Sequence, residues 1–310
     1  EPVDATHVLR GMDPGLATWL GLSPGTPVVV GAGDGMLAHV ASGCVTPERF
    51  SCTVGTSGAI RVLAGRPLLD PEQRTWCYCL DRSWWVAGGA VNNGGVVLRW
   101  LRDILGCSGS EAYHAFNQMA AQVPPGARGL IWVPLLTGER SPRWNDLASG
   151  VLVGLRLEHG RAELVRAAME GVVFRLLQAY EVLAALAGVE GELRASGGYA
   201  RSALWLQIQA DAFGRPVLRL KEPEASAMGA AIAAMKAVGA VDTWQAAETM
   251  VDVEERVEPR PEFRPIYRHL FDLFQRAYTQ ALPLFGELAA LGQLDQPWQE
   301  RSTHDDDATR

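Results

Sequence analysis

Short apolar runs that end in glycine and lead into a helical pattern recur along this chain, and they constrain its fold most. Residues 27–30 run into Gly31-Ala32-Gly33-Asp34-Gly35 before an apolar segment. Residues 193–196 run into Gly197-Gly198 before a helical stretch at 202–213. Strand, glycine turn and helix in that order form the repeating unit of α/β proteins. The sequence therefore predicts an α/β layered fold.

The other expected elements fit the same plan. Two β-prone runs at residues 50–54 and 59–63 flank Gly55-Thr56-Ser57-Gly58, which predicts a hairpin. Apolar positions recur at three- and four-residue steps over residues 162–186, which predicts a long core-facing helix. We also expect strands at 84–87, 130–134 and 217–220, helices at 96–105, 226–238 and 266–291, a polar loop at 137–144 and a surface connection at 251–265.

Length and charge exclude several classes of protein. A chain of 310 residues allows one large or two ordinary domains. The net charge of -7 argues against nucleic acid or a membrane surface as partners, because both attract clustered Lys and Arg. Five cysteines form neither an even set nor a CxxC pair, and no signal-peptide pattern opens the chain. We therefore expect free thiols in a reducing cytoplasm, and we assign no metal ligands.

Three glycine-rich turns are the candidates for chemistry, and each has a simpler structural explanation. The carboxylate of Asp34, flanked by two glycines, could accept a proton from a substrate hydroxyl, or it could only bond its own backbone. The tip Gly55-Thr56-Ser57-Gly58 could hold a phosphate, or it could be an ordinary turn. Gly197-Gly198, before a helix that begins near Ser202, could admit a nucleotide or only allow a tight turn.

Six segments, taken in order, resemble the FGGY carbohydrate kinases, and within that family they are most similar to the gluconokinases. The segments are PVVVGAGDG (27–35), GTSGAIR (55–61), NNGG (92–95), TGERSP (137–142), SGGYARS (196–202) and EASAMGAA (224–231). The resemblance covers residues 8–240. It implies the actin-like ATPase (ribonuclease H-like) fold, in which two α/β domains close over a sugar and ATP.

The resemblance also implies roles for single residues. Asp34, beside Gly33 at the substrate, matches the base that takes the proton from the sugar hydroxyl as this hydroxyl attacks the γ-phosphate of ATP, with Mg²⁺ absorbing charge. The expected nucleotide contacts are Gly55, Thr56, Ser57, Gly95, Arg99, Gly197, Gly198 and Ser202. Other members have glutamine at the position of Arg99 and asparagine at that of Ser202.

The resemblance divides the chain into three parts. Residues 1–46 match the end of the sugar-side amino-terminal domain, residues 47–292 match the nucleotide-side carboxyl-terminal domain, and residues 293–310 form an acidic tail that we expect to be disordered. Members of the family carry more of the sugar-side domain. We therefore expect a fragment with little transfer activity by itself.

The expected ligand is a sugar or sugar acid, with gluconate favoured. The expected protein partner is a second copy of the chain, which would form a homodimer. Three alternatives remain open: a kinase for xylulose, ribulose or glycerol, a nucleotide-binding remnant without transfer activity, and an actin-like or chaperone-like ATPase. In the polar loop we expect Glu139 and Arg140 to form an ion pair that stiffens the loop, and Trp144 is a candidate ligand wall.

Overall fold

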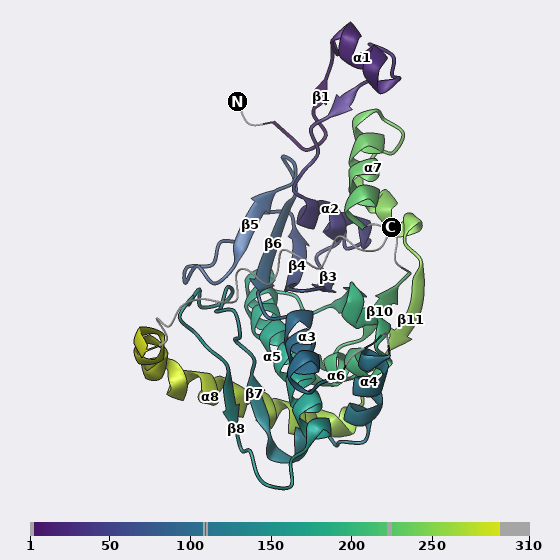
Figure 1. Cartoon of the computed structure of the whole chain (residues 1–310). Helices are drawn as coiled ribbons and strands as arrows, with labels where there is room; N and C mark the ends of the chain where they lie inside the picture. Colours follow the sequence, from purple (N-terminus) through teal and green to yellow (C-terminus); the bar gives the residue numbers. More distant parts are fainter. Residues whose placement is uncertain (1–2, 108, 110, 222–224, 292–310) are drawn as a thin grey trace.

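A seven-stranded mixed sheet lies at the centre of the molecule (Figure 1). The computed structural model describes residues 3–107, 109, 111–221 and 225–291. The strand order is β11 (Val253–Val257), β10 (Val217–Leu220), β9 (Glu192–Ser196), β3 (Arg49–Val54), β4 (Gly58–Ala64), β6 (Trp85–Val91) and β5 (Trp76–Cys79). Strand β9 is parallel to both of its neighbours, and the remaining pairs are antiparallel. The α/β prediction is confirmed.

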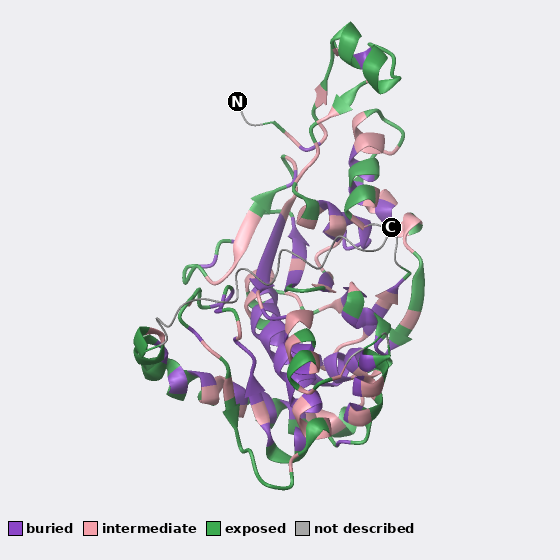
Figure 2. Ribbon diagram, viewed as in Figure 1, coloured by how far each residue is buried: buried purple, intermediate pink, exposed green. Residues whose placement is uncertain are grey.

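Helices cover both faces of this sheet. The helices α3 (Gly95–Ile104), α4 (Ala112–Ala121), α5 (Arg161–Ala187), α6 (Ala203–Phe213) and α8 (Arg264–Leu291) belong with one core, which is built around α5. Helices α2 (Asp34–Ala41) and α7 (Ala225–Ala237) pack together over the other face and form a second core. Figure 2 shows that burial is concentrated along α5 and the central strands. The sheet therefore lies between two packed helical layers, and its strand ends and turns are positioned by both of them.

Smaller elements complete the fold. A two-stranded sheet of β1 (Val8–Leu9) and β2 (Val28–Val29) projects from the body together with α1 (Pro14–Leu20), as Figure 1 shows. Strands β7 (Ile131–Val133) and β8 (Val151–Val153) form a second pair. Short 3₁₀ turns lie at Ala127–Gly129, Gly198–Arg201, Trp244–Met250 and Pro261–Phe263. Within the described part of the chain, no helix has the length and apolar character needed to cross a membrane.

The segment at 251–265 differs from its prediction as a surface connection. It contains β11, which pairs with β10 and closes one edge of the sheet. The strand has exposed acidic residues at an edge position, where one side faces water, so its composition resembles that of a loop. The expected acidic tail at 293–310 lies outside the described residues.

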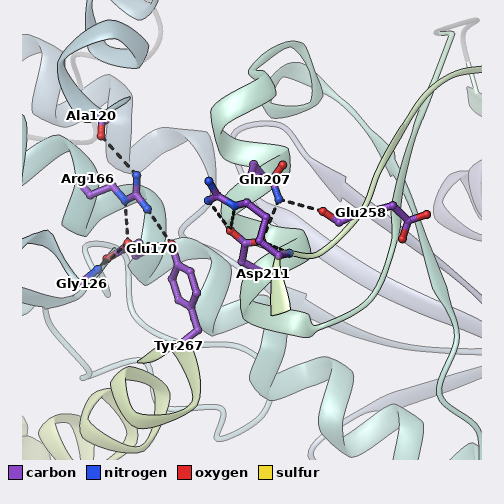
Figure 3. Close-up of polar contacts among 9 residues, drawn as sticks. Ala120, Gly126, Arg166, Glu170, Gln207, Asp211, Glu258 and Tyr267 are labelled. Carbon is purple, nitrogen blue, oxygen red and sulfur yellow. Dashed lines mark hydrogen bonds and ion pairs between the residues drawn. The ribbon is translucent and has the colours of Figure 1, made fainter. Parts of the chain in front are cut away.

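A buried ion pair on α5, hydrogen-bonded to Tyr267, ties the outer helix α8 to the core (Figure 3). Arg166 on α5 donates from Nε to Glu170 Oε1 at 2.7 Å and from Nη2 to the hydroxyl of Tyr267 on α8 at 2.7 Å. Glu170 also accepts the backbone N–H of Gly126 at 3.0 Å. Burial raises the pKa of Glu170, while Arg166 opposes that rise. These contacts hold α8 against α5 by a network in which each charge has a partner.

Candidate active site

Two pockets meet at the tip of the β3–β4 hairpin. The first, called the Asp34 pocket, has a volume of about 680 Å³ and contains Asp34, Arg61 and Arg140 among its lining residues. The second, called the Ser202 pocket, has a volume of about 530 Å³ and is lined by Arg99, Gly198 and Ser202 among others. Gly55 and Thr56 line both pockets. A ligand in either pocket therefore reaches the same two residues of the hairpin.

Asp34 begins helix α2 and presents an exposed carboxylate to its pocket. Its Oδ1 accepts the N–H of Gly35 at 2.6 Å, and Gly33 is the N-cap residue. Ser226 at the start of α7 donates its hydroxyl to the backbone carbonyl of Asp34 at 3.3 Å, so the second helix of that layer helps to hold the turn. Among the described lining residues, Asp34 is the only carboxylate of the pocket.

The hairpin tip is exposed and is held from behind by helix α3. Val54 pairs with Gly58, which leaves residues 55–57 as the tip, as predicted. The N–H of Gly95 donates to the carbonyl of Gly55 at 2.7 Å, and that of Gly94 donates to Thr56 at 3.2 Å. A Cβ atom at Gly95 would lie 2.7 Å from the Gly55 carbonyl oxygen, so the close approach requires glycine there. The first N–H groups of α3 are thus bonded to carbonyls of the tip and hold it in place.

Asn92 and Asn93 bind the polar loop to the same region. Asn93 is buried, donates to the Gly138 carbonyl at 2.8 Å and accepts the Thr137 N–H at 3.0 Å. Asn92 donates to the Thr137 carbonyl at 3.0 Å. The Asn-Asn-Gly-Gly run therefore joins the loop, through its asparagines, to the hairpin tip, through its glycines.

The expected ion pair between Glu139 and Arg140 is wrong. Glu139 is buried and pairs with the buried Arg175 of α5 at 2.6 Å, and Arg175 also donates to the Ser141 carbonyl at 2.7 Å. A buried guanidinium needs a carboxylate, and Glu139 supplies it from the loop. Arg140 is exposed and lines the Asp34 pocket instead. Trp144 lies at neither pocket, since it lines a separate groove and donates to the Gln73 carbonyl at 2.9 Å.

Ser202 lines its pocket as the N-cap residue of α6. Its Oγ accepts the Trp205 N–H at 3.1 Å and donates to Asn117 Oδ1 at 2.5 Å. Gly198 lines the pocket, whereas Gly197, with φ +89, brings the end of β9 against β3. A Cβ atom at Gly197 would lie 2.6 Å from the Val54 carbonyl oxygen. Gly95 and Arg99 also line this pocket, from α3.

Several lining residues were absent from the sequence prediction. Helix α4, which that prediction lacked, brings Tyr113 and Asn117 to the Ser202 pocket, where Met169 and Trp205 add apolar surface. An apolar slot with an amide and a hydroxyl at one end suits a purine base. Sequence spacing gives no sign of Asn117, because it contacts Ser202 across 85 residues.

The Asp34 pocket also contains Arg61, whose position could have been inferred from the alternation of side chains along the second strand of the hairpin, and two aromatic residues of β5. Arg61 follows Ala59 by two residues on β4, and both line the pocket, as alternation on a strand requires. Burial lowers the pKa of Arg61, while the nearby Asp34 carboxylate partly offsets the effect. Trp76 and Tyr78 of β5 stack with ring centroids 4.7 Å apart, and both line this pocket.

The described residues contain no group of three or more His, Cys, Asp or Glu side chains placed to hold a metal ion. A single carboxylate beside a phosphate-sized turn matches the way Mg²⁺ is held in many kinases, mainly by the phosphates with one or two carboxylates. The residues present therefore fit a metal that arrives with a nucleotide.

Comparison with known proteins places this geometry among sugar kinases. The model of the FGGY family of carbohydrate kinases, C-terminal domain, matches residues 50–238. The chain is similar to a gluconokinase of Bacillus licheniformis, 37% identical over 294 residues that make up 90% of this chain and 57% of that protein. It is also similar to a xylulose kinase of Staphylococcus epidermidis, 28% identical with 89% and 56% covered.

Solved structures agree with the sequence comparison. The crystal structure of gluconate kinase from Lactobacillus acidophilus superposes with a TM-score of 0.87 at 30% identity, covering 92% of this chain and 58% of that one. The fold is thus the actin-like ATPase fold predicted from the sequence. The chain spans about 57% of the length of the curated relative that it matches.

Proposed function

Because the chain belongs to the FGGY family of carbohydrate kinases, we propose that it transfers the γ-phosphoryl group of ATP to a hydroxyl of a sugar or sugar acid. One observation carries the proposal: the Asp34 pocket and the Ser202 pocket share Gly55 and Thr56. An acceptor in the first pocket and a nucleotide in the second would meet at this tip, where transfer requires donor and acceptor to be in line.

Asp34 is the proposed general base. An alkoxide does not form at neutral pH, so a positioned carboxylate must take the proton as the hydroxyl attacks phosphorus. The hydrogen bond from the Gly35 N–H fixes one oxygen of Asp34. The tip supplies backbone N–H groups and the Thr56 hydroxyl to the phosphates, and Mg²⁺, when bound with ATP, neutralises phosphate charge.

The proposed nucleotide site uses the Ser202 pocket. Ser202 and Asn117 offer polar groups to the base, and Tyr113 with Trp205 provides apolar walls. Gly95, Arg99 and Gly198 line the route between base and tip. The Asn117 amide stands beside the serine that replaces an asparagine found in other members, so it supplies an amide from a different helix.

Gluconate is the acceptor favoured first, and xylulose is the second candidate. The gluconokinase relative is 37% identical, against 28% for the xylulose kinase. A nucleotide-binding remnant is disfavoured because Asp34 is present and opens onto the shared tip. The domain boundaries at 46 and 292, a cytoplasmic location and a homodimer stay predictions.

The Asp34→Asn variant tests this proposal. Amide replacement removes the base, so we expect turnover with gluconate and ATP to fall on the order of a hundredfold to ten-thousandfold. The dissociation constant for ATP, measured by calorimetry, should stay within twofold because Asp34 lies outside the Ser202 pocket. Gluconate, xylulose and glycerol are assayed in parallel. Turnover by the variant equal to that of the unaltered chain would contradict the proposal.

A further inference from the structure

Arg61 carries a charge that no described carboxylate neutralises. Its Nε and Nη1 atoms are buried and have no hydrogen-bond partner. Its neighbours include the Asp34 carboxylate, which acts on it through space without forming an ion pair. A buried charge is costly unless it is paired. The guanidinium therefore gains stability from an anion that arrives from outside the protein.

The position of Arg61 separates it from the nucleotide. It lies three residues along β4 from Gly58, about 10 Å from the start of the strand at ~3.3 Å per residue. It lines the Asp34 pocket and is absent from the lining of the Ser202 pocket. A nucleotide in the Ser202 pocket therefore contacts a lining to which Arg61 does not belong.

The surroundings of Arg61 add to its attraction for an anion. A Cβ atom on Gly35 would lie 3.0 Å from Arg61 Nη2, so the guanidinium packs against the first turn of α2. The N-terminus of a helix carries positive partial charge. The pocket lining contains two cations, Arg61 and Arg140, against the single carboxylate of Asp34. A neutral sugar would leave this excess charge in place.

We propose that Arg61 is a specificity-determining residue that binds the carboxylate of a sugar acid while a hydroxyl of the same molecule lies at Asp34. This inference rests on the proposed function and names its substrate class. Trp76 and Tyr78 form the stacked aromatic wall of the pocket, against which the carbon chain of the acid packs. Guanidinium suits this task because its fork of N–H donors matches a carboxylate.

Calorimetric titration with two ligands tests the inference. D-gluconate and D-glucitol share a carbon skeleton and differ in the carboxylate, and each is titrated into the full chain saturated with AMP-PNP. We expect gluconate to bind more tightly. The Arg61→Gln variant should lose on the order of tenfold to a hundredfold in gluconate affinity and keep its glucitol affinity. Arg61→Lys, which retains the charge, should recover part of the loss, and the surface variant Arg82→Gln should match the unaltered chain.

Four results would overturn the inference. In the unaltered chain these are equal binding of both ligands and binding of neither ligand. In Arg61→Gln they are an equal loss of affinity for both ligands and a loss of AMP-PNP affinity without a loss of gluconate affinity. The last result would assign Arg61 to the phosphates. The outcome is separable from that of the proposed function. Transfer to xylulose or glycerol without preference for gluconate would refute this inference alone. Gluconate binding through Arg61 without phosphoryl transfer would refute the kinase activity alone.

Discussion

The protonation of His39 is controlled by its burial between helix α2 and the sheet. It is fully buried on α2, and its Nδ1 lies 2.7 Å from the Ser51 hydroxyl of β3. Burial, followed by the nearby charge of Arg61, lowers the pKa of His39 to about 3. The ring is therefore neutral in the folded protein at every pH at which the protein is expected to work. The residue ties the Asp34 helix to the sheet as an uncharged polar group.

The free energy of unfolding should decrease as the pH is lowered, because of His39. The unfolded chain binds a proton on this ring near pH 6.5, whereas the folded chain does not until about pH 3, so stability is lost as pH drops below 6.5. Between pH 7 and pH 5 the expected loss is about 2 kcal/mol. Urea unfolding at both values measures it. His39→Gln should flatten this dependence, and the exposed-site variant His114→Gln should retain it; an unchanged slope in His39→Gln would refute the assignment.

At the same scale, the sequence can suggest candidate residues whose exposure is decided by their immediate neighbours. Asp34 and Thr56 stand in glycine turns, so their access to a ligand is a local property. Arg140 was misassigned and Asn117 was missed, because their places depend on Arg175 and Ser202, which lie far away in the chain. Contacts between distant segments form only when the elements pack, and no local pattern encodes them.

Elements were predicted well where their pattern is strong. The hairpin, α5 and β10 occupy the residues expected of them within two positions. Strand β11 and helix α4 were not predicted, since the first is acidic and at an edge and the second contributes few buried residues. Tertiary packing, rather than propensity, makes these two regular.

The polar loop is an element without regular structure that depends on one ion pair. Replacement of Glu139 by Gln would leave Arg175 buried without its carboxylate, which should lower the free energy of unfolding by roughly 3 to 5 kcal/mol. Urea unfolding at pH 7 provides the measurement. The control is Glu158→Gln, which removes a surface pair and should cost under about 1 kcal/mol. If Glu139→Gln lowered the free energy of unfolding by no more than the control does, the Glu139–Arg175 pair would contribute little to stability.

For the whole molecule, the decisive feature is that the two layers and the sheet converge on one hairpin tip. Helix α2 brings Asp34 to one side, and α3, α4 and α6 build the pocket on the other side. The fold class could be predicted because the strand, glycine and helix order repeats along the chain. The two-sided arrangement could not, because it depends on a strand order in which β9 lies between β3 and β10.

A change at Gly95 should therefore disturb both pockets at once. The new methyl group of Gly95→Ala would lie 2.7 Å from the Gly55 carbonyl oxygen and must displace the tip. We expect KM for ATP and for the acceptor to rise together, each several-fold, in steady-state assays. Gly65→Ala, where a Cβ atom would meet nothing within 4 Å, is the control and should behave as the unaltered chain. A rise in only one KM would refute the shared role of the tip.

Gly55 and Thr56 line both pockets, and this sharing limits how each pocket can change during evolution. A substitution at either residue alters the lining of both pockets at once. Arg61, Trp76 and Tyr78 line the Asp34 pocket and not the Ser202 pocket, so substitutions at these three positions change the lining of one pocket only. Selection could therefore remodel the Asp34 pocket at these three positions while the lining of the Ser202 pocket stays unchanged.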